Sequence, residues 1–330
     1  MSSLFVDRRD VHLELDAGAL VFRENGQRMG TVPLAPITRV FLRGNVTLQA
    51  GLLGKLGEQG VGVTILSGRR GNPSLMLSRP HNDARRRVEQ TRLSLDPGFC
   101  LRYSKYLVRT KLERQHEWFE QLREDRPQNR YALSNAMRLL QGNLDSIEAC
   151  ATLDSLRGME GAAASSYFAG LRAVVPASLD FNQRNRRPPR DPFNALLSLS
   201  YSMANAEAAM ALHSAGFDPY IGFYHQLAFG RQSLACDILE TVRPMVDRFC
   251  LKLVSSQTLT ADYFSQTNVG CMLGKAGRAR YYGAYEEQAE LLRCALADET
   301  SALAKLITPQ IPGDDSNFFI PDSHDDGVSN

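Results

Sequence analysis

The residues best suited to chemistry lie in the stretch 219–244, which contains one histidine and two acids. Glycines on both sides of His225 predict a loop that leads into a helix. Asp237 and Glu240 follow three residues apart, so they share one face of that helix. A loop histidine next to two carboxylates can hold a divalent cation through nitrogen and oxygen ligands. A structural histidine near a solvated acidic face accounts for the same residues, and both interpretations stay open.

A further acid, Glu160, stands in the stretch 157–172, which is rich in small residues. On a helix it shares a face with Ala164, Tyr167 and Phe168. A carboxylate among glycines and alanines is poorly solvated unless a metal or an arginine pairs with it. An exposed acid near the start of a helix, stabilised by the helix dipole, explains Glu160 equally well.

The elements that must position these side chains change in character along the chain. Residues 3–78 contain short runs rich in valine, leucine and phenylalanine, separated by turn signals at 16–18 and 24–26. The run 11–16 alternates apolar and polar residues, as a half-buried strand does. From about residue 98 the apolar spacing becomes helical. We therefore predict an α+β protein, with a small N-terminal β domain followed by a larger all-α C-terminal domain.

The boundaries follow from the same patterns. We predict a β domain over 1–80, a basic linker over 81–97, a helical domain over 98–307 and an acidic tail over 308–330 that we expect to be disordered. Helices are predicted over 98–124, 129–157, 159–174, 193–215, 231–254 and 284–306. Pro244 is expected to kink or end the fifth of these helices.

The composition is that of a folded soluble protein, with 43% hydrophobic and 22% charged residues in 330. No apolar run reaches the ~20 residues that a membrane span needs. Acids interrupt the N-terminal window in which a signal peptide keeps its apolar core. The six cysteines are scattered without a C-x-x-C pair, which is typical of buried reduced thiols. We interpret the protein as cytoplasmic, with no membrane association.

The net charge of +2 is unevenly distributed, because most of the chain is basic and its C-terminal segment is acidic. No lysine or arginine follows Lys305, and removal of the five aspartates beyond it leaves residues 1–305 at +7. Basic residues form three clusters, each of which a solvated face explains: Arg184, Arg186, Arg187 and Arg190; Arg102, Lys105, Arg109, Lys111 and Arg114; and Lys275, Arg278 and Arg280. Three clusters beside a candidate metal site favour a nucleic acid, whose phosphates arginine and lysine bind.

Several other chemistries are disfavoured. The chain has no G-x-x-x-x-G-K-[ST] loop, no H-E-x-x-H and no G-x-S-x-G motif. Ser233 lies eight residues after His225, but nothing marks it as an activated nucleophile.

Four motifs in this order resemble those of the CRISPR-associated spacer-acquisition integrases, the Cas-one family. They are LRGNVTLQAGLLGKLGEQGVGVTIL at 42–66, GMEGAAASSYF at 158–168, FNQRNRRPPRDPFNALLSLSYS at 181–202 and DPYIGFYHQLAFGRQSLACDILETVRP at 218–244. The resemblance runs from about residue 3 to about residue 305. It implies a homodimer that pairs mainly through the N-terminal domain.

The resemblance also implies a divalent-metal site with three ligands, which match Glu160, His225 and Glu240 in this sequence. Asp237 matches an acidic position one turn before Glu240 and would support the site or share a second metal. Some family members have aspartate where Glu240 stands, and the longer side chain should preserve ligation. Oxygen ligands suit Mg²⁺, and the histidine shifts the preference toward Mn²⁺.

The implied activity is that of a metal-dependent DNA integrase and endonuclease. A 3′-hydroxyl of the incoming DNA attacks a phosphodiester at the end of a CRISPR repeat, and water in its place gives hydrolysis. The implied partners are DNA (the protospacer and the CRISPR repeat) and the small Cas-two protein, with a Cas-four-type nuclease as a further candidate. We expect Arg187, Arg190, Lys275 and Arg278 to bind phosphates and Tyr167 to line the site near the 3′ end.

Two alternatives stay open. The first is a non-catalytic DNA-binding scaffold of the adaptation complex, whose acids are structural. The second is an unrelated metallohydrolase of small phosphoesters, whose DNA binding would be weak and nearly independent of salt.

Overall fold

The structure is a computed structural model that describes residues 2–66, 74–76, 84–185, 188–268 and 270–308. The acidic tail predicted from residue 308 onward therefore lies outside the described residues, apart from Thr308. None of the helices in these described ranges has the length and apolar character needed to cross a membrane.

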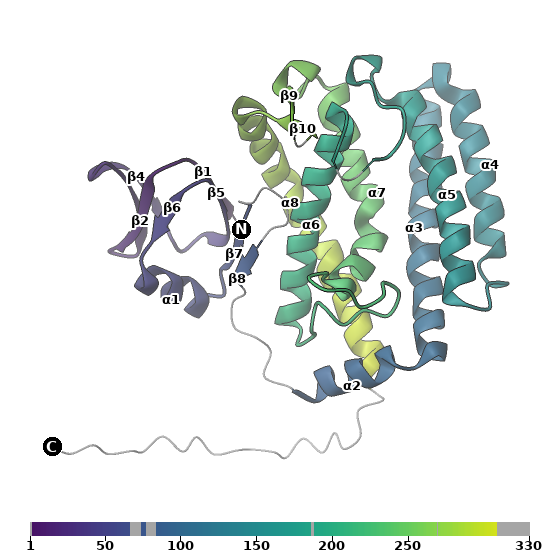
Figure 1. The fold of residues 1–330 in the computed structure, drawn as a ribbon, viewed down its shortest axis with the longest axis horizontal. Coiled ribbons are helices and arrows are strands. Elements are labelled where there is room, and N and C mark those ends of the chain that lie inside the picture. The colour runs from purple at the N-terminus through teal and green to yellow at the C-terminus, as the bar shows by residue number, and fades with distance from the viewer. Residues whose placement is uncertain (1, 67–73, 77–83, 186–187, 269, 309–330) are drawn as a thin grey trace.

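The N-terminal part consists of two four-stranded sheets with a helix beside them (Figure 1). Its elements are β1 (Ser2–Asp7), β2 (Val11–Asp16), β3 (Ala19–Glu24), β4 (Gln27–Pro33), β5 (Ile37–Arg43), β6 (Val46–Leu48), α1 (Ala50–Glu58), β7 (Gly62–Ile65) and β8 (Ser74–Met76). One sheet has the order β1-β5-β7-β8 and the other β4-β3-β2-β6. Buried valine, leucine and isoleucine side chains from both sheets and from α1 form a core of their own.

The turn signals in the sequence are confirmed. Ala17 and Gly18 link β2 to β3 with φ angles of 47° and 78°, and Asn25 and Gly26 link β3 to β4 with φ angles of 50° and 78°. Two successive residues at positive φ form the tight turn that matches the twist of a hairpin.

The C-terminal part is largely helical. Its elements are α2 (Ala84–Ser94), α3 (Pro97–Asp125), α4 (Arg130–Ser146), α5 (Leu153–Val174), α6 (Pro192–Ser214), α7 (Ser233–Ser255), β9 (Phe264–Thr267), β10 (Gly270–Leu273) and α8 (Lys275–Ile307). Short 3₁₀ turns cover Pro127–Asn129, Ala177–Leu179 and Ala261–Tyr263. The prediction of an α+β protein with a β-rich N-terminal part and a helical C-terminal part is confirmed.

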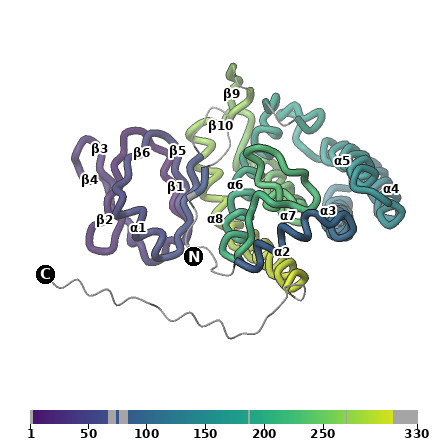
Figure 2. The backbone as a smooth tube through the Cα atoms, turned by 60° about the horizontal axis from the view of Figure 1, so that its bottom comes forward, coloured from purple at the N-terminus to yellow at the C-terminus, as the bar shows by residue number. Residues whose placement is uncertain are grey.

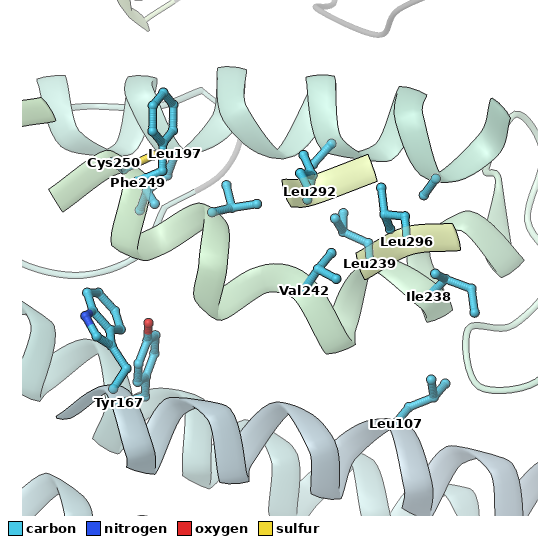
Figure 3. Packing of buried hydrophobic residues seen from close by; sticks show 14 of the residues in the cluster. Leu107, Tyr167, Leu197, Ile238, Leu239, Val242, Phe249, Cys250, Leu292 and Leu296 are labelled. Carbon is cyan, nitrogen blue, oxygen red and sulfur yellow. The ribbon is translucent and has the colours of Figure 1, made fainter. Parts of the chain in front are cut away.

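Helix α7 lies at the centre of the helical part, in contact with α3, α6 and α8 (Figure 2). Figure 3 shows Ile238, Leu239 and Val242 of α7 among the buried side chains of its neighbours. α7 runs through Pro244, so of the two predicted outcomes, a kink or an end, the end is wrong. Proline removes one backbone hydrogen bond, and burial of α7 on several sides offsets that loss.

Three other local predictions differ from the structure. The helix predicted over 129–157 is two helices, because Thr152 caps α5: its Oγ1 accepts from the Ser155 amide at 3.1 Å and its own amide donates to Ser155 Oγ at 3.2 Å. α8 begins at Lys275, nine residues before the predicted start, after a hairpin that the sequence analysis missed. The region predicted as a basic linker contains α2.

Ion pairs and stacked rings join the two parts. Glu207 of α6 is buried, and its carboxylate lies 2.9 Å from Arg39 of β5 and 2.9 Å from Arg293 of α8. Phe5 of β1 stacks on Tyr282 of α8 with ring centroids 4.6 Å apart. A buried carboxylate between two guanidinium groups holds its neighbours in a defined position, because separation would leave charges unpaired in the protein.

Candidate functional site

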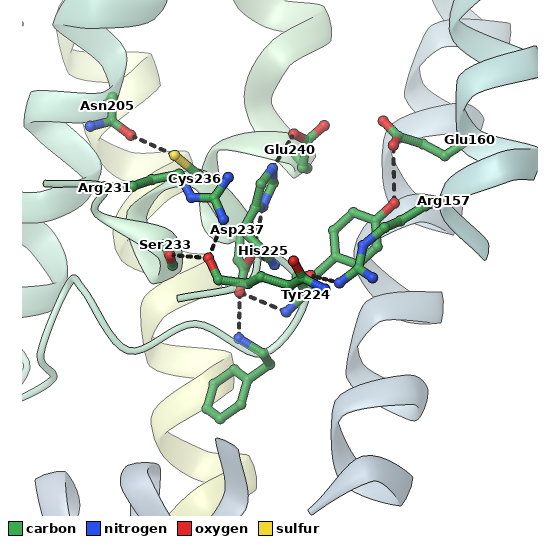
Figure 4. A network of polar contacts seen from close by, with 12 residues as sticks. Arg157, Glu160, Asn205, Tyr224, His225, Arg231, Ser233, Cys236, Asp237 and Glu240 are labelled. Atoms are coloured by element: carbon green, nitrogen blue, oxygen red, sulfur yellow. Dashed lines mark hydrogen bonds and ion pairs between the residues drawn. The ribbon is translucent and has the colours of Figure 1, made fainter. Parts of the chain in front are cut away.

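The three candidate ligands come from α7, from α5 and from the loop that precedes α7. Glu160 lies on α5, Glu240 lies on α7, and His225 lies in the loop 215–232 that joins α6 to α7. Figure 4 shows the imidazole of His225 pointing toward Glu240, and Tyr224 reaching toward Glu160. The prediction that His225 lies in a loop leading into a helix is confirmed.

Asp237 fixes the loop that carries the histidine. The Asp237 side chain is fully buried, and its Oδ2 accepts from the amides of Phe223 at 2.7 Å and Tyr224 at 3.0 Å. Its Oδ1 accepts from the amide of His225 at 2.9 Å and lies 2.7 Å from His225 Nδ1. A carboxylate with four such contacts is a positioning group, so the structure does not present Asp237 as a ligand of a second metal.

The contact with Asp237 selects the tautomer of His225. Nδ1 donates to the carboxylate, which leaves the lone pair of Nε2 available for a cation. Nε2 lies 3.8 Å from Oε1 of Glu240. Carboxylate–histidine pairs of this kind orient metal-binding imidazoles and increase their basicity.

Glu240 is buried but ionised. Burial acts to raise the pKa of the Glu240 carboxyl, but Arg243, Lys111 and neighbouring polar groups outweigh it and lower the pKa to about 2. Arg243 contacts Oε1 at 2.8 Å, and Lys111 contacts Oε2 at 2.8 Å. The site therefore presents an anionic carboxylate at any pH near neutrality.

Glu160 is bound to the same lysine. Lys111 Nζ donates to Oε1 of Glu160, and the hydroxyl of Tyr224 donates to Oε2 at 3.0 Å. Burial raises the pKa of the Tyr224 hydroxyl, and the nearby Glu160 carboxylate raises it further, so the phenol stays a proton donor. Glu160 is thus partly buried and paired with a cation, rather than an exposed acid at a helix start.

The donor set fits a divalent cation in its chemistry. The carboxylates of Glu160 and Glu240 both contact Lys111 Nζ, and Nε2 of His225 lies near Glu240. Two oxygen ligands and one nitrogen ligand suit Mg²⁺ or Mn²⁺. Within the described ranges, however, no three His, Cys, Asp or Glu side chains are already close enough together to hold an ion. Glu160 and Lys111 must therefore rearrange before the three donors can converge.

Lys111 and Tyr224 are site residues that the sequence analysis did not assign. Lys111 was counted in a basic cluster that a solvated face could explain, yet it is only 4% exposed. A signal was present in the sequence, because Lys111 is in helical phase with the apolar positions Leu107 and Trp118 of α3. Nothing comparable marks Tyr224.

A further buried acid, Asp247, lies on α7 beyond the site. Its carboxylate accepts from the hydroxyl of Tyr167 at 2.8 Å and from that of Tyr201. Burial raises the pKa of the Asp247 carboxyl to about 6, although both tyrosines and the guanidinium groups of Arg243 and Arg184 act in the opposite direction.

These contacts correct the assignment of Tyr167. Its side chain is fully buried and packs on Phe119 with ring centroids 5.0 Å apart, so it cannot touch the 3′ end of a DNA strand in this structure. Arg278, expected to bind phosphate, instead pairs with Asp7 of β1 at 2.5 Å and donates to the carbonyl of Leu273 at 2.8 Å.

The remaining DNA-binding candidates lie near one another or outside the described residues. Arg187 is outside them. Arg190 and Lys275 are exposed, and the β9–β10 hairpin connects them: the amide of Cys271 donates to Pro189 at 2.8 Å, and Gln266 donates to the carbonyl of Arg190 at 2.7 Å. Lys275 begins α8 directly after this hairpin.

Comparison with known proteins identifies relatives over most of the chain. A model of the family described as CRISPR associated protein Cas1 matches residues 4–287. The CRISPR-associated endonuclease Cas1 1 of Thermodesulfovibrio yellowstonii is 36% identical over 310 residues, which cover 93% of this chain and 97% of that protein.

Two further relatives are larger than this chain. A CRISPR-associated exonuclease Cas4/endonuclease Cas1 fusion of Geobacter sulfurreducens is 30% identical over 294 residues, which cover 87% of this chain and 53% of the fusion. A solved Cas6-RT-Cas1–Cas2 complex contains a chain that is 25% identical with a TM-score of 0.77, and the match covers 94% of this chain and 35% of that one.

Proposed function

The chain belongs to the Cas1 family of CRISPR-associated proteins, and we propose that it is a divalent-metal-dependent DNA integrase and endonuclease that inserts new spacers into a CRISPR array. The observation that carries the proposal is that Glu160 and Glu240 both contact Lys111 Nζ, while Nε2 of His225 lies 3.8 Å from Oε1 of Glu240. Its relatives are named as endonucleases, which agrees with a phosphodiester substrate.

In the proposed site Glu160, Glu240 and Nε2 of His225 hold Mg²⁺ or Mn²⁺. The bound ion would activate the attacking hydroxyl and offset the charge that develops on the phosphate. Asp237 keeps the Nε2 lone pair of His225 directed into the site through its contact with Nδ1. Arg243 helps to keep Glu240 ionised through its contact with Oε1, the oxygen that Lys111 does not contact.

The reaction is a transesterification. The oxygen of the incoming 3′-hydroxyl forms a bond to phosphorus at the repeat end and gives up its proton to solvent. The bond from phosphorus to the departing 3′-oxygen breaks, and that oxygen takes up a proton from solvent. Attack by water gives hydrolysis of the same bond. No protein nucleophile is required, in agreement with Ser233, which is buried and donates its hydroxyl to the carbonyl of Gln226 at 3.0 Å.

DNA is expected to approach across the face that carries Arg190 and Lys275. Both are exposed cations near the β9–β10 hairpin, and such groups bind phosphates without reading sequence. The proposed DNA partners are the protospacer and the CRISPR repeat.

The relatives also suggest protein partners. One solved relative is part of a complex that includes Cas2, so we propose a small Cas2-type protein as a partner. A relative that is fused to Cas4 makes a Cas4-type nuclease a further candidate. A homodimer that pairs through the β-rich part completes the proposed assembly.

A strand-transfer assay tests the function. Purified protein, a Cas2-type partner, Mn²⁺ and a repeat-containing plasmid are incubated with short duplex DNA. We expect Glu160→Ala to abolish joining, because it removes one of two carboxylate ligands. Glu148→Ala is the control, because it removes an exposed acid that pairs with Lys105 and Arg109. This variant should join DNA as efficiently as the wild type. Full activity of Glu160→Ala would contradict the proposal and favour the non-catalytic scaffold.

A further inference from the structure

A lysine ammonium stands between the two acids proposed as metal ligands. Lys111 of α3 is 4% exposed, and its Nζ lies 2.8 Å from Oε2 of Glu240 while also contacting Oε1 of Glu160. One cation therefore joins α5 to α7 through their carboxylates. Without it, two anions would face each other in a largely buried site, which is unfavourable.

The other oxygens of the two acids are also occupied. Oε1 of Glu240 lies 2.8 Å from Arg243, and Oε2 of Glu160 accepts from the hydroxyl of Tyr224 at 3.0 Å. All four carboxylate oxygens thus contact donors of the protein itself. Each oxygen keeps a second lone pair, but Lys111 Nζ occupies the point between the two acids, so an ion can bridge them there only when the lysine moves.

Lys111 is the donor best able to leave. Arg243 is held in place, because its guanidinium also lies over the ring of Tyr201, 5.3 Å from the centroid. Lysine carries its charge on a flexible four-carbon chain with a single binding atom. Departure of Lys111 also releases an oxygen on each acid at once, whereas departure of Arg243 or Tyr224 releases only one.

We propose that Lys111 is a placeholder cation that neutralises Glu160 and Glu240 in the metal-free protein and is displaced when a divalent cation binds. The inference rests on the proposed function, because it needs those acids to be metal ligands. The lysine competes with the ion for the same oxygens, so it weakens metal binding while it stabilises the empty site.

Calorimetric titration of the full-length protein with Mn²⁺ tests the competition. Lys111→Met should bind Mn²⁺ about tenfold more tightly than the wild type, because two unneutralised carboxylates then await the ion. Lys105→Met removes the same charge from a lysine of α3 that pairs with Glu148 instead of the site acids, and it should match the wild type. Unchanged or weaker binding by Lys111→Met, with normal binding by the wild type, would overturn displacement but leave the proposed function intact. Absence of binding by both proteins would overturn both.

A second measurement needs no variant at this position, which matters if Lys111→Met folds poorly. Wild-type protein is labelled with an amine-reactive reagent with and without Mn²⁺, and each lysine is quantified by mass spectrometry. Labelling of Lys111 should rise several-fold with Mn²⁺, because the ammonium leaves its buried carboxylate partners, while Lys105 serves as an unaffected internal reference. Equal labelling of Lys111 in both conditions, at an Mn²⁺ concentration that saturates the calorimetric signal, would exclude displacement.

Discussion

The Nδ1 atom of His225 lies 2.7 Å from Oδ1 of Asp237, and the same carboxylate accepts the backbone amide of His225. One buried acid therefore sets both the path of the loop and the orientation of the imidazole. The other ring nitrogen, Nε2, faces Glu240. Asp237 and Glu240 both lie on α7, and Asp237 follows His225 by twelve residues, so the loop places the histidine against the helix that comes after it.

Replacement of Asp237 by asparagine should disable the site without removing a ligand. The amide can donate to Nδ1 of His225, which favours the wrong tautomer, and it weakens the contacts with the loop amides. We expect Mn²⁺ affinity to fall about 10–100-fold, the usual effect of losing such a partner. Calorimetry measures the affinity, and Asp145→Asn on the exposed face of α4 is the control. Unchanged Mn²⁺ affinity in Asp237→Asn would show that the acid does not orient His225.

The close approach of the loop to α7 predicts an effect of Gly222→Ala. A Cβ at this position would lie 2.8 Å from Oδ2 of Asp237 and 2.8 Å from the backbone carbon of Ser233, closer than real Cβ contacts. The loop must therefore move away, which breaks its hydrogen bonds to Asp237. We expect a loss of roughly 1–3 kcal/mol in the free energy of unfolding and loss of strand transfer.

Gly142→Ala is the matched control for that substitution. Gly142 lies within α4 with nothing within 4 Å of the added Cβ, so alanine should stabilise the helix by up to about 1 kcal/mol. Urea denaturation measures both variants. Equal stability of Gly222→Ala and the wild type would mean that the loop tolerates displacement from α7.

The raised pKa of Asp247 predicts a pH dependence of stability. The carboxyl has a pKa of about 6 in the folded protein and titrates near 3.8 when unperturbed, so the folded state binds the proton more tightly. The contribution of Asp247 to stability should therefore be greatest below pH 4, fall as the pH rises from about 4 to 6, and level off above. The full loss amounts to roughly 3 kcal/mol for a buried group.

Denaturation of wild type and Asp247→Asn across pH 4–7.5 measures this contribution. The difference in unfolding free energy, wild type minus variant, should decrease through that window, because asparagine does not titrate. The groups facing the carboxyl are Tyr167, Tyr201, Arg243 and Arg184, and all keep their charge state over the range. Parallel stability profiles of the two proteins would contradict the assignment.

The cations near the β9–β10 hairpin should differ in their effect on DNA binding. Arg190→Gln and Lys275→Gln each remove an exposed charge, so affinity should fall equally for unrelated sequences, and the slope of log affinity against log salt should decrease by about one. Arg278→Gln should leave the slope unchanged and lower stability by about 1–2 kcal/mol, because this arginine pairs with Asp7. Fluorescence anisotropy at several salt concentrations separates the cases. A reduced slope in Arg278→Gln would place it on the DNA path.

Local sequence patterns specify the division into a β-rich and a helical part, the loop around His225 and the helix that follows it. These features are encoded locally, by alternation, helical spacing and glycines, and the order of four motifs identified the ligand candidates. Local patterns also misled where tertiary packing decides: Pro244 suggested a kink or an end, and α7 continues through it because burial offsets the lost hydrogen bond.

The partners of those side chains depend on how distant elements pack against one another. Lys111 contacts Glu160 across 49 residues of sequence and Arg278 contacts Asp7 across 271, and no short-range pattern specifies such pairs. The local sequence around a helical lysine does not show whether the side chain faces water or two acids. Likewise, the sequence around Tyr167 does not show whether the ring lines a cleft or lies in the core. The distinction depends on which helix faces pack together, and that packing buries charges and so determines which of them must be paired.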